Sequence, residues 1–224
     1  THPSDWLNSH LIILWGHNPA ETKLQQHHVL LKKAKAAGIP IIVIDPENDT
    51  AVALNAQWIP IRPATDSALA DAMAYVIIKE GLQDQEFLDK CCLGFDAAHM
   101  PEGEIHLNCL SYLMGETDSI PKTPEWGEKI TGIPADTIRE LAIRYATTKP
   151  AAYPGYAPEN AYGEQSARGA ILLACLTGNV GISGGSAAGA GDCSTHDCRD
   201  FRSLIILITE HASFPLADAV DHGK

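Results

Sequence analysis

The sequence has little positive charge and lacks any long apolar run. Its 16 Lys and Arg residues stand against 28 Asp and Glu residues, which gives a formal net charge of −12. This acidic balance argues against nucleic acid or an anionic membrane face as a partner. The longest apolar stretches fall well short of the ~18–20 residues that a membrane-spanning helix needs. A hydrophobic share of 45% also argues against a disordered or fibrous chain.

Paired metal-binding cysteine motifs are missing as well. No C-x-x-C pair occurs, and no short run carries the several cysteines that ligate an iron–sulfur cluster. Segment 193–198 holds two Cys and one His, which we interpret as free thiols in preference to a metal site. The vicinal pair Cys91-Cys92 is not typical of a disulfide framework, and Cys175 lies in an apolar run that predicts a small core residue. The pair His27-His28 favours a solvated or packing role over metal binding.

The length of 224 residues permits one large domain or two small ones. The chain starts at Thr1 and not at Met, so we expect a processed protein or a piece of a longer one. No N-terminal targeting signal is readable in it.

Apolar runs of strand length alternate with helical spacing in the first half of the chain. The runs at 11–15, 39–45 and 58–62 predict strands. Helical spacing over about 19–37 predicts a helix between the first two, which makes a βαβ unit with a right-handed crossover. A second helix follows Thr65, which is a suitable cap residue. We therefore expect an α/β fold, namely a Rossmann-like three-layer domain with a mostly parallel sheet.

The second half predicts further helices and a glycine-rich loop. Prolines interrupt the pattern over about 84–133, which predicts an irregular, partly helical insertion. We expect one Rossmann-like domain over 1–185, followed over 186–224 by a Gly-rich loop and the tail of an incomplete domain. The other expected elements are helices at 83–92, 134–145 and 163–176, strands at 151–156 and 203–208, and a Gly-rich loop at 178–191.

The carboxyl ends of the strands are where an open α/β sheet binds its ligands. After the first strand, Asn18, Pro19 and Glu21 match a capping-box helix start, with Asn in place of Ser or Thr. Such a start offers backbone N–H groups and a positive dipole end, which suit phosphate. A self-contained helix cap is the alternative. Because Gly-x-Gly-x-x-Gly is absent, an ordinary NAD-binding fingerprint is not supported.

Carboxylates follow the second and third predicted strands. Asp45 ends the second strand, where it is placed to accept hydrogen bonds from a ribose or a base; the alternative is a turn residue before Pro46. Asp66 lies in the first turn of the next helix, where the helix dipole favours it in any case. A carboxylate there also matches the two adjacent N–H donors of guanine. The three strand ends together favour a guanine or adenine nucleotide site, and no nucleophile–base pair stands out.

Five stretches carry a pattern specific to one family. They are Trp15–Thr22, Val43–Pro46, Pro60–Ala70, Gly163–Arg168 and Leu176–Gly185. In this order they resemble five motifs of the molybdopterin oxidoreductase family, and they are nearest to catalytic subunits of anaerobic dimethyl sulfoxide reductases. The resemblance covers about 4–185 and continues more loosely to 224.

The resemblance implies a molybdenum bis(molybdopterin guanine dinucleotide) cofactor, of which this chain would hold one dinucleotide. The resemblance assigns the matching residues to places on the dinucleotide. These are the pyrophosphate and pterin, the ribose and base, the guanine edge and, for one further glycine, the neighbourhood of the pterin. In that order they are Trp15, Gly16, Asn18, Glu21 and Thr22; Ile44, Asp45 and Pro46; Thr65 and Asp66; and Gly155. No residue of this chain is expected to ligate metal or to act in catalysis.

Some positions depart from the family pattern. Glu47 stands where the family usually has Arg, and Ala64 stands where it usually has Gly. Near Gly155, Ala157 and Asn160 replace a Gly and an Arg. A carboxylate at position 47 would repel nearby phosphates unless it turns to solvent, and Ala157 hinders a close backbone approach.

The resemblance also implies what lies around this chain. The intact enzyme would reduce S-oxides or N-oxides such as dimethyl sulfoxide by oxygen-atom transfer, and this chain alone would be inactive. An iron–sulfur cluster is implied in an N-terminal domain outside it. The implied partners are the remaining domains of the same subunit, an iron–sulfur electron-transfer subunit and a membrane anchor, with no nucleic acid. A periplasmic or membrane-associated location is implied by the same resemblance.

Two alternatives stay open at this point. One is a free-standing nucleotide-binding module without redox chemistry. The other is the central domain of a thiamine-diphosphate enzyme, which has a similar α/β style and whose nucleotide site would not need Asp66.

Overall fold

A parallel sheet organises the molecule. The computed structural model describes residues 3–22, 25–101, 103–104, 107–153 and 163–185. Within them, four strands run parallel in the order β3-β2-β1-β4. The strands are β1 (Leu11–Trp15), β2 (Ile41–Ile44), β3 (Gln57–Ile59) and β4 (Ala151–Ala152). The expected α/β fold with a mostly parallel sheet is confirmed.

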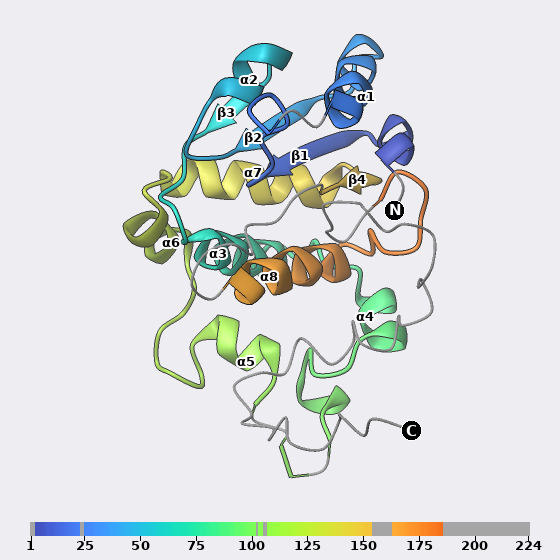
Figure 1. Ribbon diagram of the computed structural model, residues 1–224. Helices are drawn as coiled ribbons and strands as arrows, with labels where there is room; N and C mark the ends of the chain where they lie inside the picture. Colours follow the sequence, from blue (N-terminus) through green and yellow to red (C-terminus); the bar gives the residue numbers. More distant parts are fainter. Residues whose placement is uncertain (1–2, 23–24, 102, 105–106, 154–162, 186–224) are drawn as a thin grey trace, which may run out of the picture.

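The apolar strands are buried on both faces because helices cover each side (Figure 1). On one face, Ile12 and Leu14 belong to a core cluster that includes residues of three helices and of the neighbouring strands. The alternate residues Leu11, Ile13 and Trp15 point into the larger core on the other face. The first face is covered by η1 (Pro3–Asn8), α1 (Gln25–Ala36) and α2 (Asp49–Leu54), and the second by α3 (Asp66–Lys79), α7 (Ala135–Thr147) and α8 (Gly163–Leu176).

Helix α3 is the centre of the second layer, where it packs against α6 (Pro124–Thr131), α7 and α8. Two glycines make these contacts close. A Cβ added at Gly169 would lie 2.5 Å from the Ala70 Cβ, and one at Gly127 would lie 2.8 Å from the Ala72 Cβ. Small residues on both partners therefore bring α8 and α6 directly onto α3.

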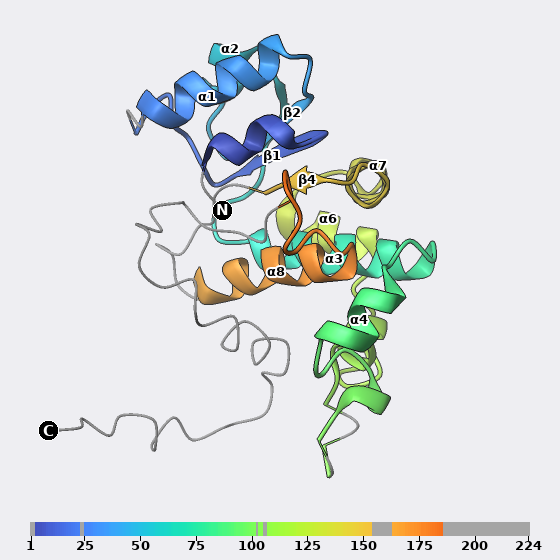
Figure 2. The ribbon, with the colours of Figure 1, turned by 90° about the vertical axis from the view of Figure 1, so that its right-hand side faces the viewer.

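The expected insertion is partly helical, and much of it lies on the side of α3 and α8 that is away from the sheet (Figures 1 and 2). Side-chain caps start three of its helices: Asp84 accepts from the Phe87 N–H, Asn108 from Ser111 and Thr123 from Trp126. Besides α6, its elements are α4 (Gln85–Cys91), η2 (Ala97–His99) and α5 (Cys109–Met114). No helix in the described ranges is long and apolar enough to cross a membrane.

Several predicted boundaries differ from the structure. The helix expected over 19–37 begins only at Gln25, and α2 was not predicted at all. Strand β3 ends at Ile59, where the missing N–H of the next residue, Pro60, stops the ladder. The expected strand at 203–208 lies outside the described residues, as do parts of the segments at 151–156 and 178–191.

Candidate functional site

The strand order creates a topological switch point. The chain runs outward from β1 to β2 and β3, and β4 then joins the other side of β1. Open α/β sheets bind ligands outside the carboxyl ends of strands at such a point. The register pairs Trp15 with Ile44 and Ile44 with Ile59, so these three strand ends lie level with one another. The residues that follow them share one edge of the sheet, as the sequence predicts.

Asp66 is held at this edge by the last residue of β1. The Trp15 Nε1–H donates to Asp66 Oδ1 across 2.7 Å, and both side chains are buried. The Trp15 ring also packs on Tyr153, with ring centroids 5.0 Å apart. Asp66 is the first residue of α3, as predicted. The sequence offered no signal that Trp15 is its donor, because the two residues belong to different motifs.

Asp45 is a second buried carboxylate at the same edge. Its Oδ1 accepts from the Glu47 N–H at 2.9 Å, so the alternative interpretation as a turn residue is correct in part. Burial raises the pKa of Asp45, and the negative charges of Glu47 and Asp66 act in the same direction. Among the described residues, no ion pair joins a Lys or Arg to Asp45 or Asp66. These two carboxylates are therefore acceptors that no Lys or Arg of the described residues neutralises in an ion pair.

Two backbone positions at the edge adopt the left-handed conformation. Gly16 has a φ of 57° and is exposed, so a ligand can approach its backbone without meeting a Cβ. Ala64, which replaces the family's usual glycine, has a φ of 64°. For an alanine this conformation costs about 1–2 kcal/mol. Residue 64 thus keeps the left-handed backbone conformation that favours glycine, although it is an alanine.

The capping box predicted at Asn18 is wrong. The Asn18 carbonyl accepts from the Glu21 and Thr22 N–H groups at 3.2 and 3.0 Å, which closes an isolated turn. Its side chain does not cap that turn, because Asn18 Oδ1 accepts from the Thr50 Oγ1 at 2.5 Å. No helix begins at Asn18, so a helix dipole there cannot attract phosphate. Glu21 and Thr22 are exposed on the turn.

The remaining predicted residues are placed as follows. Ile44 ends β2 and is fully buried, and Pro46 follows Asp45 at the surface. Thr65 directly precedes α3 but does not cap it with its side chain, since its Oγ1 donates to the Arg62 carbonyl at 2.7 Å. Gly155 lies outside the described residues.

His17 was not among the predicted site residues, although it lies between two of them. It is buried and hydrogen-bonded to His27 on α1, with 3.1 Å between Nε2 and Nδ1. Both rings meet Trp6 of η1 edge-on. Burial lowers the pKa of His17 to about 4, and the charge of His27 acts in the same direction, so His17 is neutral near pH 7. The packing role expected of His27 is confirmed. Its contact with His17 holds the start of the loop after β1 in place.

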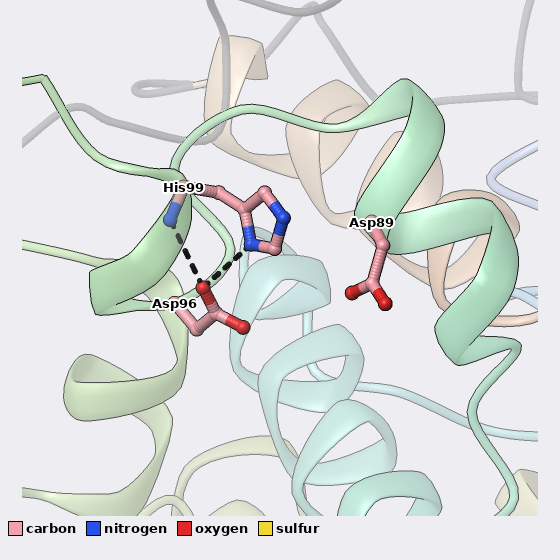
Figure 3. Close-up of side chains that lie close together, drawn as sticks. All are labelled: Asp89, Asp96 and His99. Atoms are coloured by element: carbon pink, nitrogen blue, oxygen red, sulfur yellow. Dashed lines mark hydrogen bonds and ion pairs between the residues drawn. The ribbon is translucent and has the colours of Figure 1, made fainter.

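A second group of titratable side chains lies on the insertion (Figure 3). Atoms of Asp89, Asp96 and His99 that could ligate a metal lie within 4.8 Å of one another. Asp96 Oδ1 accepts from the Ala98 and His99 N–H groups and from His99 Nδ1, at 3.0, 3.1 and 2.7 Å. Capping of η2 accounts for this arrangement, and we assign no ion to it.

Comparison with known proteins identifies the relatives of this chain. A family model described as molybdopterin oxidoreductase matches residues 1–215. DmsA, a dimethyl sulfoxide reductase of Escherichia coli K12, is 41% identical over 230 residues, which cover 99% of this chain and 28% of DmsA. DmsA of Haemophilus influenzae is 45% identical over 191 residues, which cover 82% of this chain and 24% of that protein. The chain thus spans less than a third of these relatives.

A solved structure shares the fold. Acetylene hydratase from Pelobacter acetylenicus superposes with a TM-score of 0.59 and 26% sequence identity. The match covers 79% of this chain and 22% of the hydratase. As with DmsA, the similar region is one part of a much longer protein.

Proposed function

This chain belongs to the molybdopterin oxidoreductase family, and on that premise we propose that it holds one guanine dinucleotide of the family's molybdenum–pterin cofactor. The observation that carries the proposal is the pair of buried carboxylates, Asp45 and Asp66, at the topological switch point. The alternative of a free-standing nucleotide-binding module has no support from the relatives, which are oxidoreductases.

The donor and acceptor pattern at the edge fits a guanine nucleotide. Guanine presents two adjacent N–H donors, and Asp66 offers a desolvated carboxylate whose orientation is set by Trp15. The charge of Asp66 is near enough to raise the pKa of Asp45, and Asp45 is placed to accept from ribose hydroxyls. Each added donor would offset the cost of burying these two acceptors.

The diphosphate needs a different kind of partner. Asp45 and Asp66 have no Lys or Arg as an ion-pair partner among the described residues, and we expect backbone N–H groups near the exposed, left-handed Gly16 to contact the diphosphate. Further positive charge would come from parts of the whole protein outside this chain.

The catalytic activity belongs to the whole protein. When bound, the molybdenum–pterin group supplies the oxygen-atom transfer chemistry, by which the whole enzyme would reduce S-oxides or N-oxides such as dimethyl sulfoxide. The residues of this chain bind the nucleotide end and orient it on a rigid sheet edge. The proposed partners are the remaining domains of the same subunit, including one with an iron–sulfur cluster, together with an electron-transfer subunit and a membrane anchor.

A nucleotide titration tests the site. The chain is titrated with GDP, IDP and ADP, and binding is followed by calorimetry. We expect GDP to bind best, IDP more weakly because it lacks the exocyclic amine, and ADP weakest. Asp66→Asn should reduce GDP affinity about tenfold or more, since a charged acceptor is lost. Asp71→Asn, on the same helix but beneath the insertion, is the matched control and should bind like the parent. Equal affinities for the three nucleotides, or no effect of Asp66→Asn, would overturn the assignment.

A chimera tests the role in a whole enzyme. Residues 1–224 replace the matching segment of E. coli DmsA, which is 41% identical. We expect the chimera to retain dimethyl sulfoxide reduction and to release guanine nucleotide when its cofactor is hydrolysed. The chimera with Asp66→Asn should contain less guanine nucleotide per protein. A folded chimera without bound cofactor would count against the proposal.

A further inference from the structure

Trp58 is an exposed aromatic side chain beside the proposed nucleotide site. It is the middle residue of β3 and is 39% exposed, whereas the next residue, Ile59, is buried in the core. Its register partner on β2 is Val43, which belongs to the core cluster that β2 shares with α1 and α2. Because successive side chains of a strand point to opposite faces, the Trp58 ring lies on the α1 and α2 face of the sheet.

A hydrogen bond turns this ring toward the carboxyl edge of the sheet. Trp58 Nε1–H donates to the carbonyl oxygen of Asp45 across 2.9 Å. Asp45 directly follows Ile44, the last residue of β2, so the indole reaches past the end of the neighbouring strand. The ring is therefore fixed beside the residue whose carboxylate is assigned to the ribose. The contact uses the main chain of Asp45 and leaves its carboxylate for the ligand.

Two other aromatic rings at this edge are already covered by protein. Trp15 and Tyr153 are 3% and 2% exposed and pack on each other. The indole N–H of Trp15 is used for Asp66. Of these three rings at the carboxyl edge, all within the part of the chain that the structure describes, Trp58 is thus the exposed one.

The two carboxylates leave the flat faces of a bound base without a partner. Asp66 is assigned to the N–H donors on the edge of guanine, and Asp45 is assigned to the ribose. Hydrogen bonds to the edge of a base lie close to the plane of its ring, so they do not remove water from its faces. Stacking on an aromatic side chain supplies that contact and strengthens binding about tenfold or more for each base.

We propose that Trp58 is the stacking platform for the guanine base, a role that rests on the function proposed above. The indole, held in position by its hydrogen bond to Asp45, packs against one face of the base while Asp66 accepts from the edge of the base. Stacking tolerates any purine because every base has a π face, whereas the acceptor at Asp66 distinguishes guanine from adenine. Trp58 thus contributes affinity, and Asp66 contributes the choice of base.

Two substitutions at Trp58 separate the ring from its hydrogen bond. The full chain, Trp58→Leu and Trp58→Phe are titrated with GDP, IDP and ADP in a calorimeter. We expect Trp58→Leu to weaken the binding of all three nucleotides by a similar factor of about ten, since each loses the same stacking contact. Trp58→Phe loses the N–H donor but keeps an aromatic face, so its loss should be smaller, about threefold. Trp126→Phe, on the insertion, is the matched control and should bind like the parent.

Acrylamide quenching of tryptophan fluorescence tests the contact without a substitution at Trp58. The chain has four tryptophans, of which Trp6 and Trp15 are buried. Trp126→Phe removes a third, so the accessible emission of that variant comes from Trp58. We expect saturating GDP to reduce the acrylamide quenching of this emission, because the base covers the indole.

Three outcomes would overturn the stacking role and leave the proposed function intact. The first is an unchanged GDP affinity in Trp58→Leu. The second is an equal loss in Trp58→Leu and Trp58→Phe, which would assign the effect to the hydrogen bond and not to the ring. The third is undiminished acrylamide quenching of Trp58 at saturating GDP. A parent chain that does not bind GDP would instead overturn the proposed function and the stacking role together.

Discussion

Asp66 and Asp71 lie on the same helix, α3, and each accepts a hydrogen bond from an aromatic side chain. Trp15 Nε1–H donates to Asp66 across 2.7 Å, and the Tyr112 hydroxyl donates to Asp71 across 3.2 Å. Their charged surroundings differ. Lys122 of the insertion acts on Asp71, whereas the acidic group Asp45 is near Asp66. The insertion completes its own network, while the sheet edge keeps acceptors for an outside donor.

Lys122 is the centre of the insertion's network. Its side chain is 2% exposed, and its Nζ donates to Asp118 Oδ2 at 2.5 Å and to the Ile120 carbonyl at 2.6 Å. The ammonium also lies 4.3 Å from the centroid of the Tyr112 ring and 5.6 Å from that of Trp126. A desolvated cation with this many partners fixes the loop before α6 against the rest of the insertion.

The largest expected effect comes from removing that cation. Lys122→Ala should lower the free energy of unfolding by about 3 kcal/mol, because it removes a buried side chain together with its hydrogen bonds and its contacts with the Tyr112 and Trp126 rings. The matched control is Lys90→Ala, since Lys90 and Glu86 have the same i,i+4 spacing and a distance of 2.6 Å but are exposed. The control should change stability by about 0.5 kcal/mol or less. Urea unfolding measures both, and equal losses would show that burial does not distinguish the two pairs.

The second largest expected effect is a change in stability that depends on pH. Burial raises the pKa of Asp71 from 3.8 to about 6, against the opposing influence of Tyr112 and Lys122. Folding therefore favours the protonated form, so the stability from this group is fully present below pH 3.8 and is lost as the pH rises through about 6. Asp71→Asn should be more stable than the parent at pH 7 by about 2–3 kcal/mol and should match it near pH 4. Thermal unfolding across pH 4–7 measures the difference, and a constant difference would contradict the expectation.

Removing either aromatic donor should have a smaller effect on stability, and the two substitutions should differ in their effect on GDP binding. Trp15→Phe and Tyr112→Phe each remove one hydrogen bond to a carboxylate of α3 and should each lower stability by about 1–2 kcal/mol. Only Trp15→Phe should weaken GDP binding, because only Asp66 is assigned to the base. Unfolding and titration of the two variants side by side measure both quantities. A similar loss of GDP affinity in Tyr112→Phe would break the distinction between the regions.

The smallest effect concerns the strained backbone before α3. Ala64→Gly should raise stability by about 0.5 kcal/mol, since relief of the left-handed strain exceeds the entropy that glycine loses. Ala68→Gly, within the first turns of α3, is the control of opposite sign and should lower stability by about 1 kcal/mol. Thermal unfolding distinguishes them, and destabilisation by Ala64→Gly would refute the strain.

Local patterns predicted the elements better than their junctions. The apolar runs that became β1 and β2 and the helical spacing of α3 and α8 depend on neighbours in the chain, and they were confirmed. The loop after β1 was predicted wrongly because Thr50, from a helix that was itself missed, takes the Asn18 side chain that was expected to cap. Helix α2 is short, and the side chain of its N-cap residue Asn48 makes no capping hydrogen bond.

By itself, the sequence determined the parallel α/β order, the placement of Asp45 and Asp66 after successive strands, and membership in its family. Periodicity and motif order suffice for these, because they are properties of short stretches. Only the tertiary structure decided that Trp15 holds Asp66 and that Lys122 acts on Asp71. Each of these contacts joins segments far apart in the chain, and it exists only after packing has brought helices and strand ends together and removed water from their polar groups.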